Sequence, residues 1–121
     1  MQNSIKSYLY FAAIALHFSL MSCGLVRAQP EATSLAESAY KHSDIQLNEV
    51  YKSILNRIPP NAKQGFVESQ RAWIAFRDLD AKCRAGIASQ GGSSYSTDYL
   101  AILTELTAQR VAHLKNLLLA L

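Results

Sequence analysis

The sequence predicts an all-α fold, in which three helices form a bundle or a long helical hairpin with a third packed helix. Two observations support this prediction. Apolar residues recur at helical spacing over most of the chain after residue 34. Pro59-Pro60 and Gly91-Gly92 then divide that periodic stretch into three parts.

Residues 1–28 are predicted to be a signal peptide that precedes the fold. Lys6 is followed by an uncharged apolar run from Tyr8 to Met21. This run has the length of a signal-peptide core and falls short of the roughly 20 residues of a membrane span. Val26-Arg-Ala28 places small residues before a cleavage site at Gln29. The mature domain is therefore expected to comprise residues 29–121 and to be periplasmic or secreted.

Two alternatives remain for this leader. Leu20-Met-Ser-Cys23 resembles a lipobox, with an atypical Met at its second position, so Cys23 could carry a lipid anchor. The other alternative is a retained transmembrane helix. Contact with a membrane is expected only if Cys23 is lipidated.

The charge of the chain argues against a nucleic-acid partner. The full sequence has 12 Lys and Arg against 9 Asp and Glu. Removal of Lys6 and Arg27 with the leader leaves ten against nine. Most of the excess positive charge therefore belongs to the leader and gives no support for binding nucleic acid or an anionic membrane. The mature length suffices for one small domain.

The first helix is expected from about Ser34 to Arg57. Ser34-Leu-Ala-Glu37 has the pattern of a capping box, and Pro59-Pro60 ends the helix because proline cannot donate a backbone hydrogen bond. Its apolar stripe comprises Leu47, Val50, Tyr51, Ile54 and Ile58.

The second helix is expected from a cap at Asn61 to about Ser89, before Gly91-Gly92. A polar turn from Gly91 to Ser96 should follow, with Tyr95 inside it.

The third helix is expected to begin at Ser96 or Thr97, with Asp98 beside its positive end. Its predicted stripe comprises Leu103, Leu106, Arg110, Leu114, Leu117 and Leu121.

The segment Ser69–Asp78 mixes the only tryptophan with long polar side chains on one side of the second helix. At about 100° per residue, one arc contains Phe66, Gln70, Trp73, Ile74, Arg77 and Arg84. Arg77 and Arg110 fall near the centres of their apolar stripes, where an unpaired charge would be costly. We therefore predict a structural polar network that fixes helix register, made of Asp44, Asn48, Gln70, Trp73, Arg77, Asp78 and Arg110. The alternative is that these arginines recognise an acidic group.

Catalytic and metal-binding patterns are missing from the sequence. His42 and His113 have no ligand-type residue at zinc spacing, and Ser93 has no evident base beside it. We predict a protein that is not an enzyme and has no cofactor, catalytic residue or metal ligand.

Residues 34–118 resemble the LprI-like family of small exported bacterial proteins, whose namesake is described as a lysozyme inhibitor. The resemblance rests on four groups of residues in the same order, which are Asp44 with Leu47-Asn48 and Tyr51, Gln70-Arg-Ala-Trp73 with Phe76-Arg-Asp78, Gly91-Gly-Ser93, and Leu106-Thr107 with Arg110. Family members often carry three cysteines, but Cys83 alone remains in the mature part, and Ile102 occupies another of the expected positions. Cys83 could be an inert thiol, an intermolecular disulfide or a reactive site.

The resemblance implies an inhibitor that binds lysozyme or another cell-wall glycosidase. The turn that contains Gly91, Gly92, Ser93 and Tyr95, with Arg84 nearby, is our candidate partner-binding site because glycosidase clefts carry paired carboxylates. The alternative is a periplasmic interaction module that docks through a helix face onto another envelope protein. A pocket for a small ligand around Trp73 and Arg77 is a third hypothesis.

Overall fold

The computed structural model describes residues 31–121, so the predicted signal peptide, its cleavage site and Cys23 lie outside the described residues. The compact unit that carries the fold runs from Thr33 to Leu121. The described helices are an N-terminal helix (residues 31–57), α2 (Pro60–Ser89) and α3 (Tyr95–Leu119). The all-α prediction is confirmed, and residues 31–121 contain no strand.

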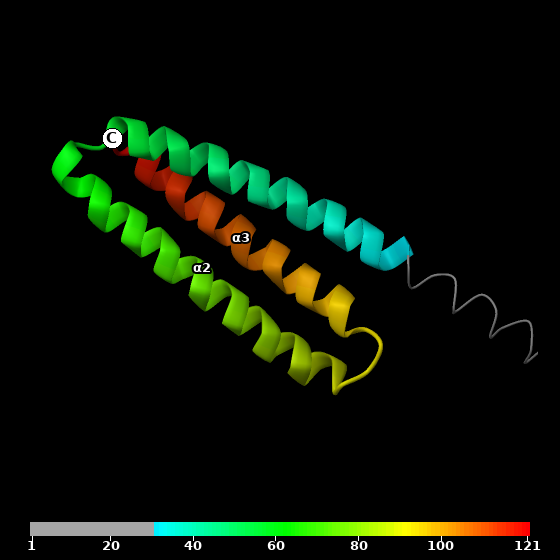
Figure 1. Ribbon diagram of the computed structural model, residues 1–121. Coiled ribbons are helices and arrows are strands. Elements are labelled where there is room, and N and C mark those ends of the chain that lie inside the picture. Colours follow the sequence, from blue (N-terminus) through cyan, green and yellow to red (C-terminus); the bar gives the residue numbers. More distant parts are fainter. Residues whose placement is uncertain (1–30) are drawn as a thin grey trace, which may run out of the picture. The chain divides into compact units, whose positions relative to one another are not determined.

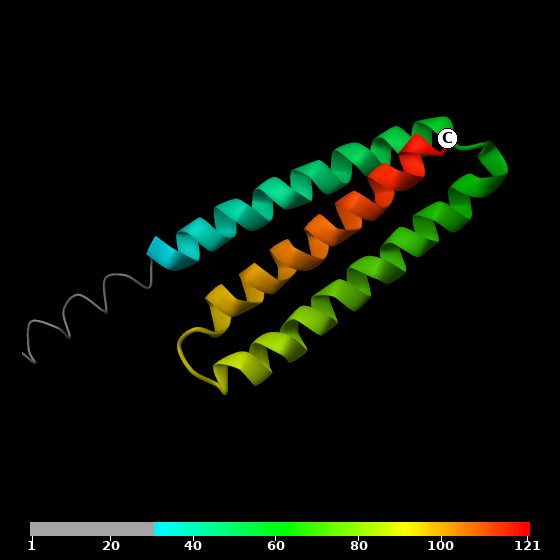
Figure 2. The same cartoon turned by 180° about the vertical axis from the view of Figure 1, so that it is seen from behind.

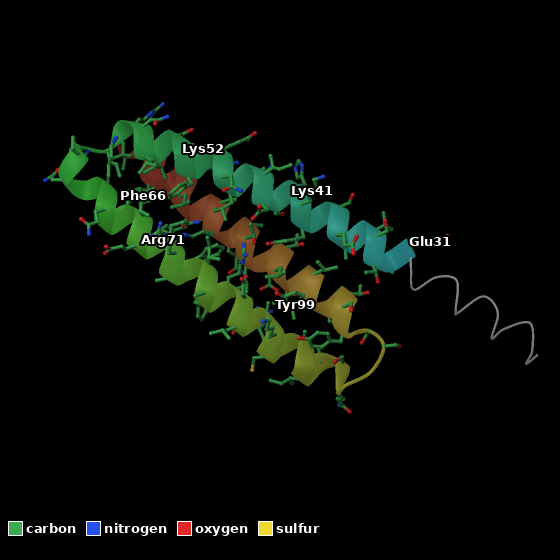
Figure 3. The ribbon with its side chains drawn as sticks, viewed as in Figure 1. Glu31, Lys41, Lys52, Phe66, Arg71 and Tyr99 are labelled. Atoms are coloured by element: carbon green, nitrogen blue, oxygen red, sulfur yellow. The ribbon has the colours of Figure 1, made fainter. Side chains whose placement is uncertain are left out.

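The three helices form an up-down-up bundle (Figure 1). The chain reverses at Pro59-Pro60 and again after α2, so that the C-terminus lies beside the first turn; the view from behind shows the same arrangement (Figure 2). Tyr51 of the N-terminal helix stacks on Phe66 of α2, with ring centroids 5.1 Å apart, and Figure 3 shows Phe66 between these helices. Thr33 and Thr97 share a hydrogen bond of 3.1 Å between the N-terminal helix and α3.

Both predicted N-caps are wrong. The chain is already helical at residue 31, so Ser34 lies inside the helix. In α2 the N-cap is Pro59 and Pro60 occupies the first turn, without a side-chain capping bond. Proline suits this place because its ring fixes a helical φ and its missing N–H has no partner there anyway. Asn61 therefore does not cap α2.

The turn between α2 and α3 is shorter than predicted. α2 ends at Ser89 as expected, and Gln90 and Gly91 take positive φ angles of 48° and 79°. The amide of Gly92 donates to the carbonyl oxygen of Ser89 at 2.7 Å, which reverses the chain tightly. α3 consequently starts at Tyr95, and Tyr95 and Ser96 belong to the helix rather than to the turn.

The apolar core occupies the half of the bundle near Pro59-Pro60. The predicted stripe of the N-terminal helix is confirmed, since its members are buried or packed against the core. The core cluster comprises Leu47, Val50, Ile54, Val111 and Leu114, with Tyr51, Ile58, Phe66, Trp73 and Leu118 against it.

The predicted stripe of α3 is displaced around the helix. Its buried residues are Leu103, Thr107, Val111 and Leu114, whereas Leu117 and Leu121 are 38% and 54% exposed. Thr107 is fully buried because its hydroxyl faces Arg77. The buried face of α3 therefore includes the polar Thr107, which the predicted stripe left out.

Candidate functional site

Arg77 joins all three helices at the middle of the bundle. Its residue is only 5% exposed. Nη2 lies 2.8 Å from Oδ1 of Asp78, and Nε donates to the same oxygen at 2.9 Å. Nη1 lies 3.6 Å from Oδ1 of Asp44 on the N-terminal helix and 3.5 Å from the hydroxyl of Thr107 on α3. These contacts satisfy a guanidinium that would be costly to bury unpaired.

Asp44 is in turn positioned by its own helix. The side-chain amide of Asn48 donates to the carboxylate of Asp44 at 3.1 Å and to its backbone oxygen at 2.9 Å. The ring of Tyr40 lies one turn earlier, 5.6 Å from the Arg77 guanidinium. Burial raises the pKa of Tyr40, and the positive charge of Arg77 partly opposes that rise.

Trp73 connects Arg77 to Arg110. The two guanidinium carbons lie 5.4 and 5.5 Å from the centre of the indole ring, within the range of cation–π attraction. Nε of Arg110 donates to the side-chain oxygen of Gln70 at 3.1 Å. The structure thus brings together the residues of the predicted network.

Sequence reasoning missed two members of this cluster. Thr107 follows Leu103 and precedes Val111 at intervals of four, so a wheel drawn through those residues would have placed it on the inner face. Tyr40 lies four residues before Asp44, which puts it on the same side of the N-terminal helix.

An open groove lies between α2 and α3 beside this cluster. Its volume is about 270 Å³, and it is lined by Trp73, Phe76, Leu106, Gln109, Arg110 and His113. Burial lowers the pKa of Arg110. Arg110 rather than Arg77 lines this groove beside Trp73, so the groove differs from the small-ligand pocket predicted around Trp73 and Arg77.

The proposed partner-binding turn lies at the opposite end of the bundle from the core. Gly91, Gly92 and Ser93 are exposed. Tyr95 is 38% exposed and stacks parallel to Tyr99, with ring centroids 6.2 Å apart.

Arg84 was expected near the turn, but its contacts lie further along the helices. Its Nη2 contacts Oε2 of Glu105 at 2.9 Å, and Nη1 lies 3.7 Å from Asp80. The hydrogen bond with Glu105 is the main reason that the pKa of Arg84 is raised. Glu105 follows Tyr95 by ten residues, or about 15 Å of helix, so Arg84 ties α2 to α3 well behind the turn.

Cys83 is a free, exposed thiol. Among the described residues no group of His, Cys, Asp and Glu could hold a metal ion. No helix within residues 31–121 has the length and apolar character needed to cross a membrane.

Comparison with known proteins assigns the chain to a family. The model of the family described as "Lysozyme inhibitor LprI" matches residues 25–114. The chain belongs to the LprI family. Nearly all of the bundle, from the N-terminal helix to Leu114 of α3, lies within the match.

A curated relative supports the same extent of similarity. An uncharacterized protein of Rhizobium meliloti (strain 1021) is 30% identical over 109 residues, which cover 79% of this chain and 78% of the relative. No solved structure matches the chain.

Proposed function

We propose that this LprI-family chain is exported and that its mature domain inhibits lysozyme or another cell-wall glycosidase by binding it, without catalysis. The observation that carries the proposal is the match to the lysozyme inhibitor family over residues 25–114. The buried Arg77 supports a non-catalytic role for the central cluster, because it contacts Asp44 on the N-terminal helix, Asp78 on α2 and Thr107 on α3.

The turn between α2 and α3 is the proposed binding surface. It projects from the end of two long helices (Figure 1), and Gly91, Gly92 and Ser93 are exposed there. Glycosidase clefts present carboxylates, which accept hydrogen bonds from hydroxyl and backbone N–H groups. Since Arg84 is paired with Glu105 and the Gly92 amide donates to Ser89, the turn would act through the ring and hydroxyl of the exposed Tyr95.

Inhibition of cell-wall lysis tests this proposal. The mature domain should slow lysis by a lysozyme stoichiometrically. Tyr95→Ala should raise the inhibition constant at least tenfold, about 1.4 kcal/mol, because buried aromatic anchors dominate many interfaces.

Lys52→Ala is the matched control, since Lys52 is an exposed side chain on the N-terminal helix (Figure 3). It should inhibit as the wild type does, and both variants should keep the helical circular dichroism spectrum. Full inhibition by Tyr95→Ala would exclude the turn as the binding surface. No inhibition by the wild-type domain across several lysozymes and other cell-wall glycosidases would exclude the proposed function.

An interaction module for another envelope protein is the second candidate. It is favoured by exposed apolar side chains on α2, where Phe76, Leu79 and Ile87 are 57%, 67% and 71% exposed. Their spacing places them along one side of the helix. Leu79→Ser should weaken association with such a partner and leave lysozyme inhibition unchanged.

A further inference from the structure

We propose that the groove between α2 and α3 binds a carboxylate carried on a small apolar body. The groove holds about 270 Å³ and is lined by Trp73, Phe76, Leu106, Gln109, Arg110 and His113. Its walls therefore combine the apolar side chains of Trp73, Phe76 and Leu106 with an amide, an imidazole and one guanidinium.

Arg110 differs from Arg77 and Arg84 in its partners. Arg77 pairs with Asp44 and Asp78, and Arg84 pairs with Asp80 and Glu105. Within residues 31–121 no ion pair involves Arg110, whose hydrogen-bond partner is the neutral amide oxygen of Gln70. A partly buried guanidinium without a counter-charge favours binding of an anion.

The surrounding acids are already engaged. Glu105 lies one turn before Gln109 and Arg110 on α3, and its two carboxylate oxygens accept from Gln109 and Arg84. Asp78 on α2 accepts from Arg77. Residues 1–30 contain no Asp or Glu. The acids of this region therefore leave the charge of Arg110 available to a ligand.

The chemistry of the groove selects the ligand class. Gln70 uses the Nε–H of Arg110, and a guanidinium has four further N–H donors that suit the two oxygens of a carboxylate. Trp73, Phe76 and Leu106 offer apolar contact to the rest of the ligand. Sites for drug-sized ligands span roughly 300–1,000 Å³, so this groove suits a group the size of one side chain, such as phenylacetate.

Fluorescence of Trp73 provides a direct test, because the chain has one tryptophan and that residue lines the groove. Titration of the mature domain with phenylacetate should change the emission saturably in the millimolar range, at constant ionic strength. Phenylacetamide has the same shape without the charge and should bind at least tenfold more weakly. Equal responses to the two compounds, or no saturable response to phenylacetate, would overturn the proposal.

Two variants and one control test whether the fluorescence response comes from the groove. Arg110→Gln removes the charge and should weaken phenylacetate binding at least tenfold, whereas Arg71→Gln, an exposed arginine on α2 (Figure 3), should not change it. Phe76→Ala removes an exposed wall residue without touching the Arg110–Gln70 bond and should weaken binding several-fold. Unchanged affinity in both Arg110→Gln and Phe76→Ala would place the ligand elsewhere and overturn the assignment.

Peptides distinguish the source of the carboxylate. A short peptide with a free C-terminal phenylalanine is compared with its C-terminal amide and with an end-blocked peptide that contains Asp beside Phe. Preference for the free terminus identifies a chain end as the ligand, and binding of the Asp peptide identifies an acidic side chain. These titrations contain no lysozyme, so their result is independent of the proposed inhibition.

Discussion

At the scale of single residues, the two arginines beside Trp73 should contribute unequally to stability. Arg77→Ala removes a buried side chain that contacts Asp44, Asp78 and Thr107. We expect the free energy of unfolding to fall by about 2–4 kcal/mol, because hydrogen bonds and buried packing are lost together. Arg110→Ala removes one hydrogen bond to a neutral amide and should cost about 1 kcal/mol.

Urea unfolding of the two variants at neutral pH measures this difference. Equal losses would mean that the pairing of Arg77 with two acids adds nothing beyond an ordinary hydrogen bond. The structure also revises the prediction from sequence that both arginines lie near the centres of apolar stripes. Arg77 lies there, but Arg110 lies at the edge and lines the groove.

Tyr40 should make stability fall at alkaline pH. Burial is the main cause that raises its pKa above the ordinary value of about 10. Above about pH 10 the unfolded chain releases the phenolic proton while the folded chain retains it, so the free energy of unfolding decreases as pH rises. Below about pH 10 Tyr40 is protonated in both the folded and the unfolded chain, so its contribution to the free energy of unfolding is fully present.

Tyr40→Phe removes this titration. Its free energy of unfolding, measured in urea at pH 8, 10 and 11, should decline less steeply than that of the wild type. Burial also raises the pKa of Tyr99, but Tyr99 is present in both proteins and its effect cancels in the comparison. Parallel declines would show that Tyr40 has no role in the alkaline loss.

Among single residues, the members of the cluster that could be predicted were long polar side chains on a largely apolar face. Arg77 and Gln70 stood on a face that also carried Trp73, so burial required partners for them. A helical wheel could have placed Thr107 on the inner face, but its side chain carries no charge whose burial would have required a partner. Its role depends on the distance between two helices, which a single-helix wheel does not contain.

At the scale of elements, the α2–α3 turn should tolerate substitution less than the helices it connects. A Cβ at Gly92 would lie 2.9 Å from the backbone oxygen of Ser89, and that oxygen accepts the Gly92 amide. Gly92→Ala should therefore lower the free energy of unfolding by about 1–2 kcal/mol, as the turn must shift.

Gly86→Ala is the matched control within α2. A Cβ there has no neighbouring atom within 4 Å, so alanine should stabilise the helix by roughly 0.5–1 kcal/mol. Thermal unfolding of the two variants should shift in opposite directions. A destabilised Gly86→Ala would indicate that this face of α2 is covered.

The ends of the helices show which elements the sequence could define. Pro59-Pro60 and Gly91-Gly92 marked both breaks because their backbone chemistry acts locally. The start of the N-terminal helix and the start of α3 were misplaced because Ser34 and Ser96 can cap a helix but need not do so. In the structure, Asp98 donates its backbone N–H to Ser94, which closes the first turn of α3 earlier than Ser96.

At the scale of the whole molecule, polar contacts of Arg77 link the three helices near the middle, and apolar packing is concentrated at one end. The core cluster lies between Leu47 and Ile54 on the N-terminal helix and between Val111 and Leu114 on α3. Towards the other end, small residues such as Ala81 and Ala85 are buried, and Arg84 pairs with Glu105 across the helices. Sequence periodicity could predict three helices, but this division depends on register and was visible only in the structure.

Export of the protein should involve cleavage of the leader after Ala28. The compact unit begins at Thr33, so cleavage after Ala28 would remove the leader without cutting the bundle. We expect the mature protein from a native host to begin at Gln29 by mass spectrometry. Its free energy of unfolding should be set by the contacts of residues 33–121, so a chain trimmed to Thr33 should unfold at a closely similar urea concentration.

The same measurement separates the alternatives for the leader. An acylated Cys23 at the N-terminus would establish a lipoprotein, held at a membrane by about ten residues before Thr33. Recovery of the full-length chain alone would indicate a retained signal anchor. Cleavage at Gln29 leaves Cys83 as the one cysteine of the product, so quantitative labelling of one thiol per chain should accompany that result.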